Sequence, residues 1–228
     1  MSEDPIPGEA PHMVIYNRIW TSIAERKLRP GTRLKEEQLA EIFDVSRARV
    51  RQALSALERD GLVTLVPNRG AFVAEPGIEE ARDVFFARRA IEAALLRRLC
   101  AAPEPTMVDR LRAHVAEECA ARARADRSGV IRLSGGFHLL VAELAGSPYL
   151  TDVLRDLISR TSLITAMYQP RTHVDCGPDE HAQIVDSIAR GDCAAAQAAM
   201  DHHLRHIEAE LDLAEDASLS GDLKEILL

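Results

Sequence analysis

The hydrophobic period changes between residues 36 and 73, and this change constrains the fold more than any other feature of the sequence. Two stretches with apolar residues at helical spacing, 36–43 and 46–61, are followed by two short strand-like runs, 62–66 and 71–74. Only two residues separate the helical stretches, and Pro67, Asn68 and Gly70 lie between the strands. We therefore predict a helix, a tight turn, a second helix and a two-strand hairpin, or wing.

Helical spacing dominates the rest of the chain. A further helix is expected at 13–26, and from residue 77 to about residue 216 the pattern is helical, with breaks at 101–105, near Ser128 and Gly129, at 146–148, at 169–178 and at Gly191. We expect a mainly α protein: an N-terminal winged helix-turn-helix of three helices plus a two-strand wing, then an all-α bundle of six to seven helices. The expected divisions are 10–75 for the winged helix-turn-helix, 77–215 for the bundle and 216–228 for a frayed tail.

Charge is divided unevenly along the chain, which carries a formal net charge of −8. Residues 14–74 contain 11 Lys and Arg against 7 Asp and Glu, whereas residues 77–228 contain 17 against 25. The basic first third can therefore approach a nucleic acid although the whole chain is acidic. Since no apolar run approaches the roughly 20 residues that cross a bilayer, we expect a cytoplasmic protein without a membrane partner.

The second helix of the turn has the features of a DNA-reading helix. Such a helix enters the major groove with its N-terminal side chains toward the base edges. Arg47 and Arg51 are four residues apart and share one face, which suits bidentate contacts with guanine. The expected DNA contacts are Ser46, Arg47, Arg49, Arg51, Asn68, Arg69 and Gly70. The alternative is that these arginines form an ordinary solvated helix face.

The stretch RPGTRLKEEQLAEIFDVSRARVRQALSALERDGLVTLVPNRGAFV, residues 29–73, resembles the winged helix of GntR-type bacterial transcription regulators. This resemblance implies that a homodimer binds a double-stranded DNA operator, with Arg47, Arg51 and Gly70 among the contacts. One departure is Arg-Ala-Arg at 47–49, where relatives commonly have Arg-Thr-Pro. The departure leaves the role of Arg49 open.

Three of the eight histidines are predicted to face the interior of the bundle. His181 begins an apolar stripe with helical spacing, and His138 lies at the edge of the stripe on its own helix. In the last helix His203 borders the stripe, whereas His206 lies about 120° away and His202 nearly opposite. Three imidazoles that converge in a bundle suit a divalent transition metal with open coordination positions. The alternative is that each is a hydrogen-bonded core histidine.

Three further stretches are similar to the FCD effector domain of FadR-like GntR regulators: RRAIE at 88–92, GGFHLLVAELAGSPYL at 135–150 and EHAQIVDSIARGDCAAAQAAMDHHL at 180–204. In metal-binding members, positions matching His138, His181 and His203 hold the ion together with an Asp four residues before the first. Ser134 stands at that position here. The resemblance therefore implies a divalent metal (zinc, nickel or manganese) at a site that has lost one anionic ligand.

The same resemblance implies that the bundle binds a small organic acid through Arg88, because the planar fork of arginine gives a carboxylate two charge-assisted hydrogen bonds. Ser134 and Tyr168 are expected beside it. The alternative for Arg88 is an ion pair with Glu92, which lies one turn later on the same helix.

The sequence thus predicts a transcription regulator rather than an enzyme, with operator affinity switched by the organic acid. One alternative is a metal sensor in which metal occupancy itself is the signal, although the missing Asp ligand disfavours it. A remote alternative is a metal-dependent hydrolase fused to a DNA-binding domain. A hydrolase needs a general base beside the metal, and Glu180, next to His181, is expected to point elsewhere.

Overall fold

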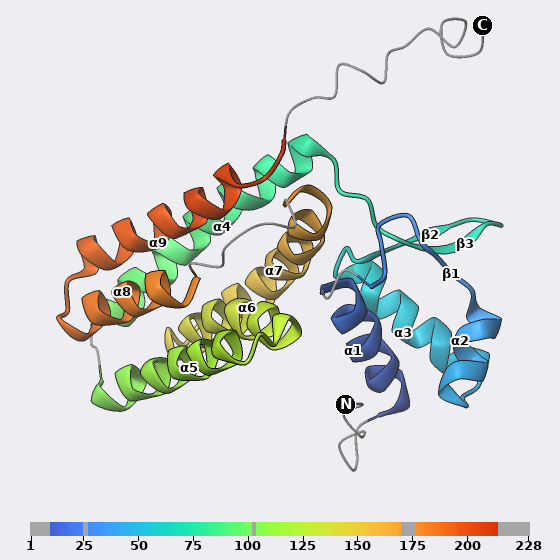
Figure 1. The fold of residues 1–228 in the computed structure, drawn as a ribbon, viewed down its shortest axis with the longest axis horizontal. Coiled ribbons are helices and arrows are strands. Elements are labelled where there is room, and N and C mark those ends of the chain that lie inside the picture. The colour runs from blue at the N-terminus through green and yellow to red at the C-terminus, as the bar shows by residue number, and fades with distance from the viewer. Residues whose placement is uncertain (1–9, 25–26, 102–103, 170–176, 214–228) are drawn as a thin grey trace, which may run out of the picture.

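The computed structural model describes residues 10–24, 27–101, 104–169 and 177–213. Within these residues the chain forms nine helices and one small sheet, arranged as two parts that lie side by side (Figure 1). The elements are α1 (Pro11–Ala24), β1 (Arg33–Leu34), α2 (Glu36–Phe43), α3 (Arg47–Arg59), β2 (Val63–Val66), β3 (Gly70–Val73), α4 (Ile78–Ala101), α5 (Pro105–Ala123), α6 (Arg127–Leu144), α7 (Pro148–Tyr168), α8 (Gly177–Ala189) and α9 (Cys193–Ala209). The predicted fold class is confirmed. The tail expected at 216–228 lies outside the described residues.

The winged-helix part has its own apolar core. Ile15, Ile19 and Ile23 follow one another at four-residue intervals on α1 and are buried. They pack in one cluster with Val50 and Leu54 of α3. The amphipathic stripe of each helix therefore faces the other, which leaves the opposite face of α3 open to solvent.

The wing is a sheet with strand order β1-β3-β2. β2 and β3 form the predicted antiparallel hairpin, with Val63 opposite Val73 and Val66 opposite Gly70. β1 adds a third strand to it, in which Arg33 lies opposite Phe72. A strand of two residues is too short to show an alternating pattern, so β1 could not be predicted from hydrophobic period.

The bundle is built around α4, which packs along α9 and α7, while α5 packs on α6 and α8. The helix break predicted near Ser128 and Gly129 lies slightly earlier. α5 ends at Ala123, Ala125 takes a positive φ of 54°, and the Asp126 side chain caps α6 by accepting from the backbone N–H of Gly129 at 2.9 Å. Ser128 and Gly129 therefore belong to the first turn of α6, where an Asx cap begins the helix.

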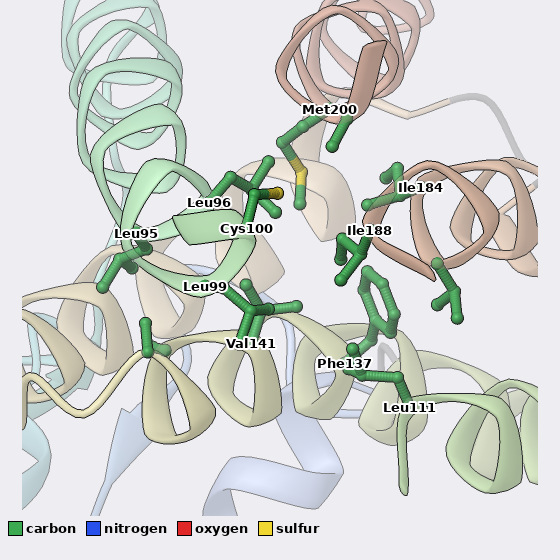
Figure 2. Close-up of a cluster of buried hydrophobic side chains, with 14 of the residues drawn as sticks. Leu95, Leu96, Leu99, Cys100, Leu111, Phe137, Val141, Ile184, Ile188 and Met200 are labelled. Carbon is green, nitrogen blue, oxygen red and sulfur yellow. The ribbon is translucent and has the colours of Figure 1, made fainter. Parts of the chain in front are cut away.

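A second apolar core fills the bundle (Figure 2). It includes Leu95, Leu96, Leu99 and Cys100 from α4, Leu111 from α5, Phe137 and Val141 from α6, Ile184 and Ile188 from α8, and Met200 from α9. The Phe137 ring is fully buried and stacks on the ring of His181, with the two centroids 4.0 Å apart. This core therefore borders the inward histidines. Among the described helices, none is long and apolar enough to span a membrane.

Candidate functional site

The N-terminal end of α3 is exposed. Asp44, in the left-handed conformation (φ 50°, ψ 51°), ends α2 and redirects the chain into α3. Arg47, Arg49 and Arg51 all lie on the solvent side, and Ser46 precedes them as the exposed N-cap residue. The four side chains predicted to meet DNA on this helix are therefore accessible together.

Two of these arginines pair with acidic residues of α2. Arg51 Nε lies 2.8 Å from Glu36 Oε2, and Arg47 pairs with Glu37. All four side chains are between 38% and 72% exposed, and exposed pairs of this kind contribute about 1 kcal/mol or less. DNA phosphates or guanines can therefore replace these carboxylates at a small cost in free energy.

The wing tip is a tight turn flanked by cations. Asn68 and Gly70 have positive φ angles of 60° and 100°, which a short hairpin connection requires. The guanidinium carbons of Arg69 and Arg33 lie 5.8 Å and 6.0 Å from the centre of the Phe72 ring. Arg33 was not among the predicted contacts, because it reaches the wing only through the pairing of β1 with β3.

The three histidines predicted to face inward meet in the core of the bundle. His138 on α6, His181 on α8 and His203 on α9 are each at most 2% exposed. Ligand nitrogens of all three lie within 4.8 Å of one another, and the Nε2 atoms of His181 and His203 are 3.2 Å apart. By contrast, His202 is exposed and His206 is half-buried, in keeping with their predicted angles on α9.

A different glutamate lies at the Nδ1 atom of each of these imidazoles. The distances are 2.5 Å from His138 Nδ1 to Glu92 Oε2, 2.9 Å from His181 Nδ1 to Glu118 Oε2 and 2.6 Å from His203 Nδ1 to Glu180 Oε2. Since a carboxylate accepts hydrogen bonds, each Nδ1 donates, and in a neutral imidazole Nε2 then keeps its lone pair. Carboxylates in this position are typical of metal sites, where they fix the tautomer and the orientation of ligand histidines.

The Nε2 atoms of His181 and His203 therefore face each other inside the cluster. Burial lowers the pKa of His138 to about 4, although Glu92 opposes this shift. Burial, together with the neighbouring imidazoles, lowers the pKa of His181 well below its usual value. Although burial raises the pKa of Glu92, His138 and Arg88 outweigh it and hold the value at about 2. Imidazole nitrogens this close together, with carboxylates behind them, form a site that suits a cation.

Glu180, expected to point away from the metal position, reaches the histidines through their Nδ1 atoms. Its Oε2 accepts from His203 Nδ1 and its Oε1 accepts from His206 Nδ1, both at 2.6 Å. Because α8 packs against α9, a residue one position before the inward His181 faces the neighbouring helix. Both oxygens are engaged on the Nδ1 side of the imidazoles, so Glu180 is not positioned as the general base that a hydrolase would need.

Arg88 is buried and lies behind His138. Its Nε donates to Glu92 Oε1 at 2.9 Å, so the ion pair considered as an alternative does form. Its Nη1 donates to Thr161 Oγ1 at 3.4 Å. Its Nη2 is buried and has no hydrogen-bond partner among the described residues. A buried guanidinium nitrogen without a partner costs free energy, and an anionic ligand would relieve that cost.

Comparison with known protein families agrees with both parts of this architecture. Residues 12–73 match the model of the gntR family of bacterial regulatory proteins, and residues 83–206, more than half of the chain, match the FCD domain. The chain belongs to the GntR family. It is therefore a transcription regulator with a GntR helix-turn-helix domain and an FCD domain, as the sequence resemblance implied.

Known GntR regulators align with most of the chain. The HTH-type transcriptional repressor RspR of Escherichia coli K12 is 27% identical over 206 residues, which are 88% of this chain and 89% of RspR. A regulator from an unstable DNA locus of Streptomyces ambofaciens is 30% identical over 202 residues, covering 85% of this chain and 81% of the relative. A crystal structure of a GntR regulator from Rhodococcus sp. RHA1 has a TM-score of 0.75 at 27% identity, covering 87% and 95% of the two chains. The matched families and relatives are DNA-binding regulators.

The remaining residues predicted for the FCD site of this GntR protein lie at different distances from the histidines. Ser134 is half-buried on α6, one turn before His138. Tyr168 lies at the end of α7, where its hydroxyl donates to the backbone carbonyl of Pro76 at 2.9 Å, so the structure brings it to the interdomain connection rather than to the histidines. Glu118 was not predicted from the sequence, because it lies on α5, a helix without any other predicted site residue.

Proposed function

We propose that this GntR regulator binds an operator as a homodimer and that a small organic acid, bound in the FCD domain beside a divalent metal, switches its affinity for DNA. The observation that carries the proposal is the convergence of three buried imidazoles next to a buried arginine, one nitrogen of which has no partner among the described residues. Metals and carboxylates are the ligands that such donors recognise.

The donor set fits a divalent ion. His138, His181 and His203 would hold it through Nε2, and the 3.2 Å approach of two acceptor nitrogens is favourable only when a cation lies between them. Three nitrogen donors without a carboxylate favour zinc or nickel over manganese. Three ligands leave open coordination positions, and there a bound metal would supply Lewis acidity for an acid group.

The charge behind the histidines also supports a divalent cation. Glu92, Glu118 and Glu180 contact the three Nδ1 atoms, and Arg88 is paired with Glu92. Two negative charges therefore remain after the ion pair is formed. The glutamates contact the histidines rather than the ion itself. They therefore make up for the negative charge of the Asp that Ser134 replaces, but they do not replace that Asp as a ligand.

Arg88 would bind the carboxylate of the effector. Its Nε and Nη1 are already engaged, which fixes the guanidinium, and within the described part of the chain Nη2 has no acceptor. Specificity for an acid follows, because a neutral ligand would leave the buried cation without a new charged partner. On the DNA side, Ser46, Arg47, Arg49, Arg51 and the wing tip (Asn68, Arg69, Gly70) would contact the operator, and two reading helices must be spaced by about one turn of DNA, which a homodimer provides.

A thermal-shift screen of small mono- and dicarboxylates tests the proposal on purified protein of known metal content. We expect stabilisation by some acid in the metal-loaded protein, a reduced shift in the presence of a chelator, and loss of the shift in Arg88→Met. The matched control is Arg89→Met, which changes the adjacent arginine that pairs with Glu208 on α9. Equal shifts with and without chelator would contradict the role of the metal, and equal shifts in both variants would contradict the role of Arg88.

A further inference from the structure

Residues 159–163 of α7 touch both parts of the molecule. α7 belongs to the FCD bundle, yet Leu163 is fully buried within the core cluster of the winged helix, together with Ile15, Ile19 and Leu57. Figure 1 shows α7 running from the bundle toward α1 and α3, and α1 packs on α7. The position of α7 is therefore part of what holds the winged helix in place.

Arg160, three residues before Leu163, lies against the end of the reading helix α3. Gly61 follows α3 with a positive φ of 68°, and a Cβ there would lie only 2.5 Å from Arg160 Cζ. Arg160 Nη1 also donates to Glu80 Oε1 of α4 at 2.6 Å. The guanidinium thus packs on the turn that ends α3 and is held there by the first turn of α4.

Ser159 lies beside a second contact of the same junction. The Tyr16 hydroxyl of α1 donates to Asp60 Oδ2, at the C-terminal cap of α3. Burial and the Asp60 carboxylate raise the pKa of Tyr16, while the Ser159 hydroxyl acts in the opposite direction through its hydrogen bond. Arg160 therefore contacts Gly61 directly, and Ser159 reaches Asp60 through Tyr16.

Thr161 connects the same segment to Arg88. Its hydroxyl accepts from Arg88 Nη1 at 3.4 Å and donates to the carbonyl of Leu157 at 2.8 Å. Arg88 in turn donates a hydrogen bond to Glu92, which also accepts one from His138. Within about one helical turn, α7 therefore carries one residue that meets the buried arginine and three that meet the DNA-binding part.

We propose that the 159–163 segment of α7 couples the Arg88 site to the C-terminal end of α3, with Thr161 and Arg160 as positioning residues. A change in how Arg88 is held moves Thr161, and because the segment is one rigid turn, Arg160 and Leu163 move with it. α3 has 13 residues, about 20 Å of helix, so a small displacement at Gly61 tilts the arginines at the other end. This inference uses the proposed function only in taking Arg88 as the effector contact.

Hydrogen exchange of the full chain, with chelator and without DNA or any acid, tests this coupling. The readout is the exchange of the backbone amides of Asp60, Gly61 and Leu62, which hydrogen-bond back into the last turn of α3. Thr161→Val removes the hydroxyl that meets Arg88, and we expect it to speed this exchange about two- to thirtyfold. Thr161→Ser retains the hydroxyl and should restore the original rate.

Ser162→Ala is the matched control. The Ser162 hydroxyl donates to the carbonyl four residues earlier, Ile158 at 3.1 Å, as the Thr161 hydroxyl does to Leu157, so this variant removes the same kind of helix contact one position away. It should leave the α3 amides unchanged. In an Arg160→Met background, Thr161→Val should have a smaller effect, because the direct contact between α7 and Gly61 is gone.

Three outcomes would overturn the coupling: no change at the α3 amides in Thr161→Val, an equal change in Ser162→Ala, or an undiminished effect of Thr161→Val in the Arg160→Met background. Circular dichroism of each variant checks that the helices remain formed, and the Thr161→Ser variant separates loss of the hydroxyl from altered packing. Because no effector enters the experiment, its failure leaves the proposed function standing. Conversely, a failed carboxylate screen would leave this result intact.

Discussion

A carboxylate at Nδ1 does two things for a ligand histidine: it fixes which nitrogen carries the proton, and it makes the other nitrogen more basic. In this regulator three separate helices supply such carboxylates, from Glu92 on α4, Glu118 on α5 and Glu180 on α8. The site therefore depends on the packing of the whole bundle, and each glutamate can be tested singly.

Glu118→Gln is expected to lower zinc affinity about 10- to 100-fold, because an amide still accepts from His181 Nδ1 but without the negative charge. Competition with a chromogenic chelator measures the affinity. Glu117→Gln, at the adjacent exposed position of α5, is the control and should leave it unchanged. Equal affinities in both variants would mean that Glu118 contributes packing alone.

His206 has a carboxylate at each ring nitrogen, with Glu180 at Nδ1 (2.6 Å) and Glu210 at Nε2 (3.1 Å). Both nitrogens can donate only in the imidazolium, and these contacts, led by the Glu180 hydrogen bond, raise the pKa of His206 above its usual value. A raised pKa gives stability that is complete below the unfolded pKa and is lost as pH rises through the folded one. The stabilisation by His206 should therefore fade at alkaline pH.

Urea unfolding of chelator-treated protein measures this pH dependence. The difference in unfolding free energy between the wild type and His206→Gln should be at most about 1 kcal/mol near pH 6 and should shrink as pH rises toward about 9. His202→Gln, whose exposed imidazole lies 3.9 Å from Glu180, should show a smaller difference. A difference for His206→Gln that stays constant across this range would show that the imidazolium is not what stabilises the fold.

Helical angle alone predicted which histidines face inward, because burial depends on the apolar stripe of each helix taken separately. That His138, His181 and His203 meet was inferred from the family resemblance, and their role as ligands stays a prediction. The sequence could not indicate which glutamates contact the Nδ1 atoms, because these contacts depend on how neighbouring helices are aligned along their axes. Glu118, 63 residues from His181 in the chain, had no local signal.

At the scale of elements, we propose that α3 and the wing make different kinds of contact with DNA. The arginines at the N-terminal end of α3 suit base edges, whereas the wing tip suits the sugar-phosphate backbone. Arg47→Ala and Arg51→Ala should each cost about 1–3 kcal/mol of operator-binding free energy and relax sequence preference. Arg69→Ala should weaken binding to all DNA sequences alike and reduce the slope of log affinity against log salt concentration by about one.

Fluorescence anisotropy with operator and scrambled DNA, titrated over salt concentration, separates these effects. Arg59→Ala changes an exposed arginine at the opposite end of α3 and serves as the control for lost positive charge. If Arg47→Ala and Arg59→Ala weakened binding equally, α3 would contribute charge rather than base contacts.

The elements that the sequence predicted well are those with several turns of one period, such as α3 and α4. β1 was missed because it spans two residues, and the break between α5 and α6 was displaced because Asp126, rather than Gly129, determines where the helix begins. In both cases a single backbone interaction decides the boundary, and hydrophobic period carries no information about it.

For the whole molecule, the uneven charge of the sequence becomes a spatial division. Figure 1 shows α2, the adjoining end of α3 and the β2–β3 hairpin on the side of the molecule away from the bundle. A duplex would attract the basic first part more than the acidic second part, which favours an orientation with the winged helix toward the DNA. The contacts between the two parts then determine how closely the orientation of α3 is tied to that of the bundle.

Gly61 lies at that junction, and its substitution tests how closely the two parts are joined. Gly61→Ala forces an L side chain into positive φ and pushes its Cβ against the Arg160 guanidinium, which would have to give up its bond to Glu80. Gly191→Ala is the matched control, since Gly191 has nearly the same φ of 67° but nothing within 4 Å of a Cβ. Each variant should lose about 1 kcal/mol through the backbone.

The additional cost of Gly61→Ala should depend on Arg160. In urea unfolding, Gly61→Ala and Arg160→Ala should show a coupling energy of about 0.5 kcal/mol or more, because the alanine has no guanidinium to displace once Arg160 is gone. Gly191→Ala and Arg160→Ala should be additive, since these positions share no contact. Additivity in both pairs would mean that the Arg160 side chain moves aside at no measurable cost. The packing of Leu163 would then be the contact that holds the winged helix to the bundle.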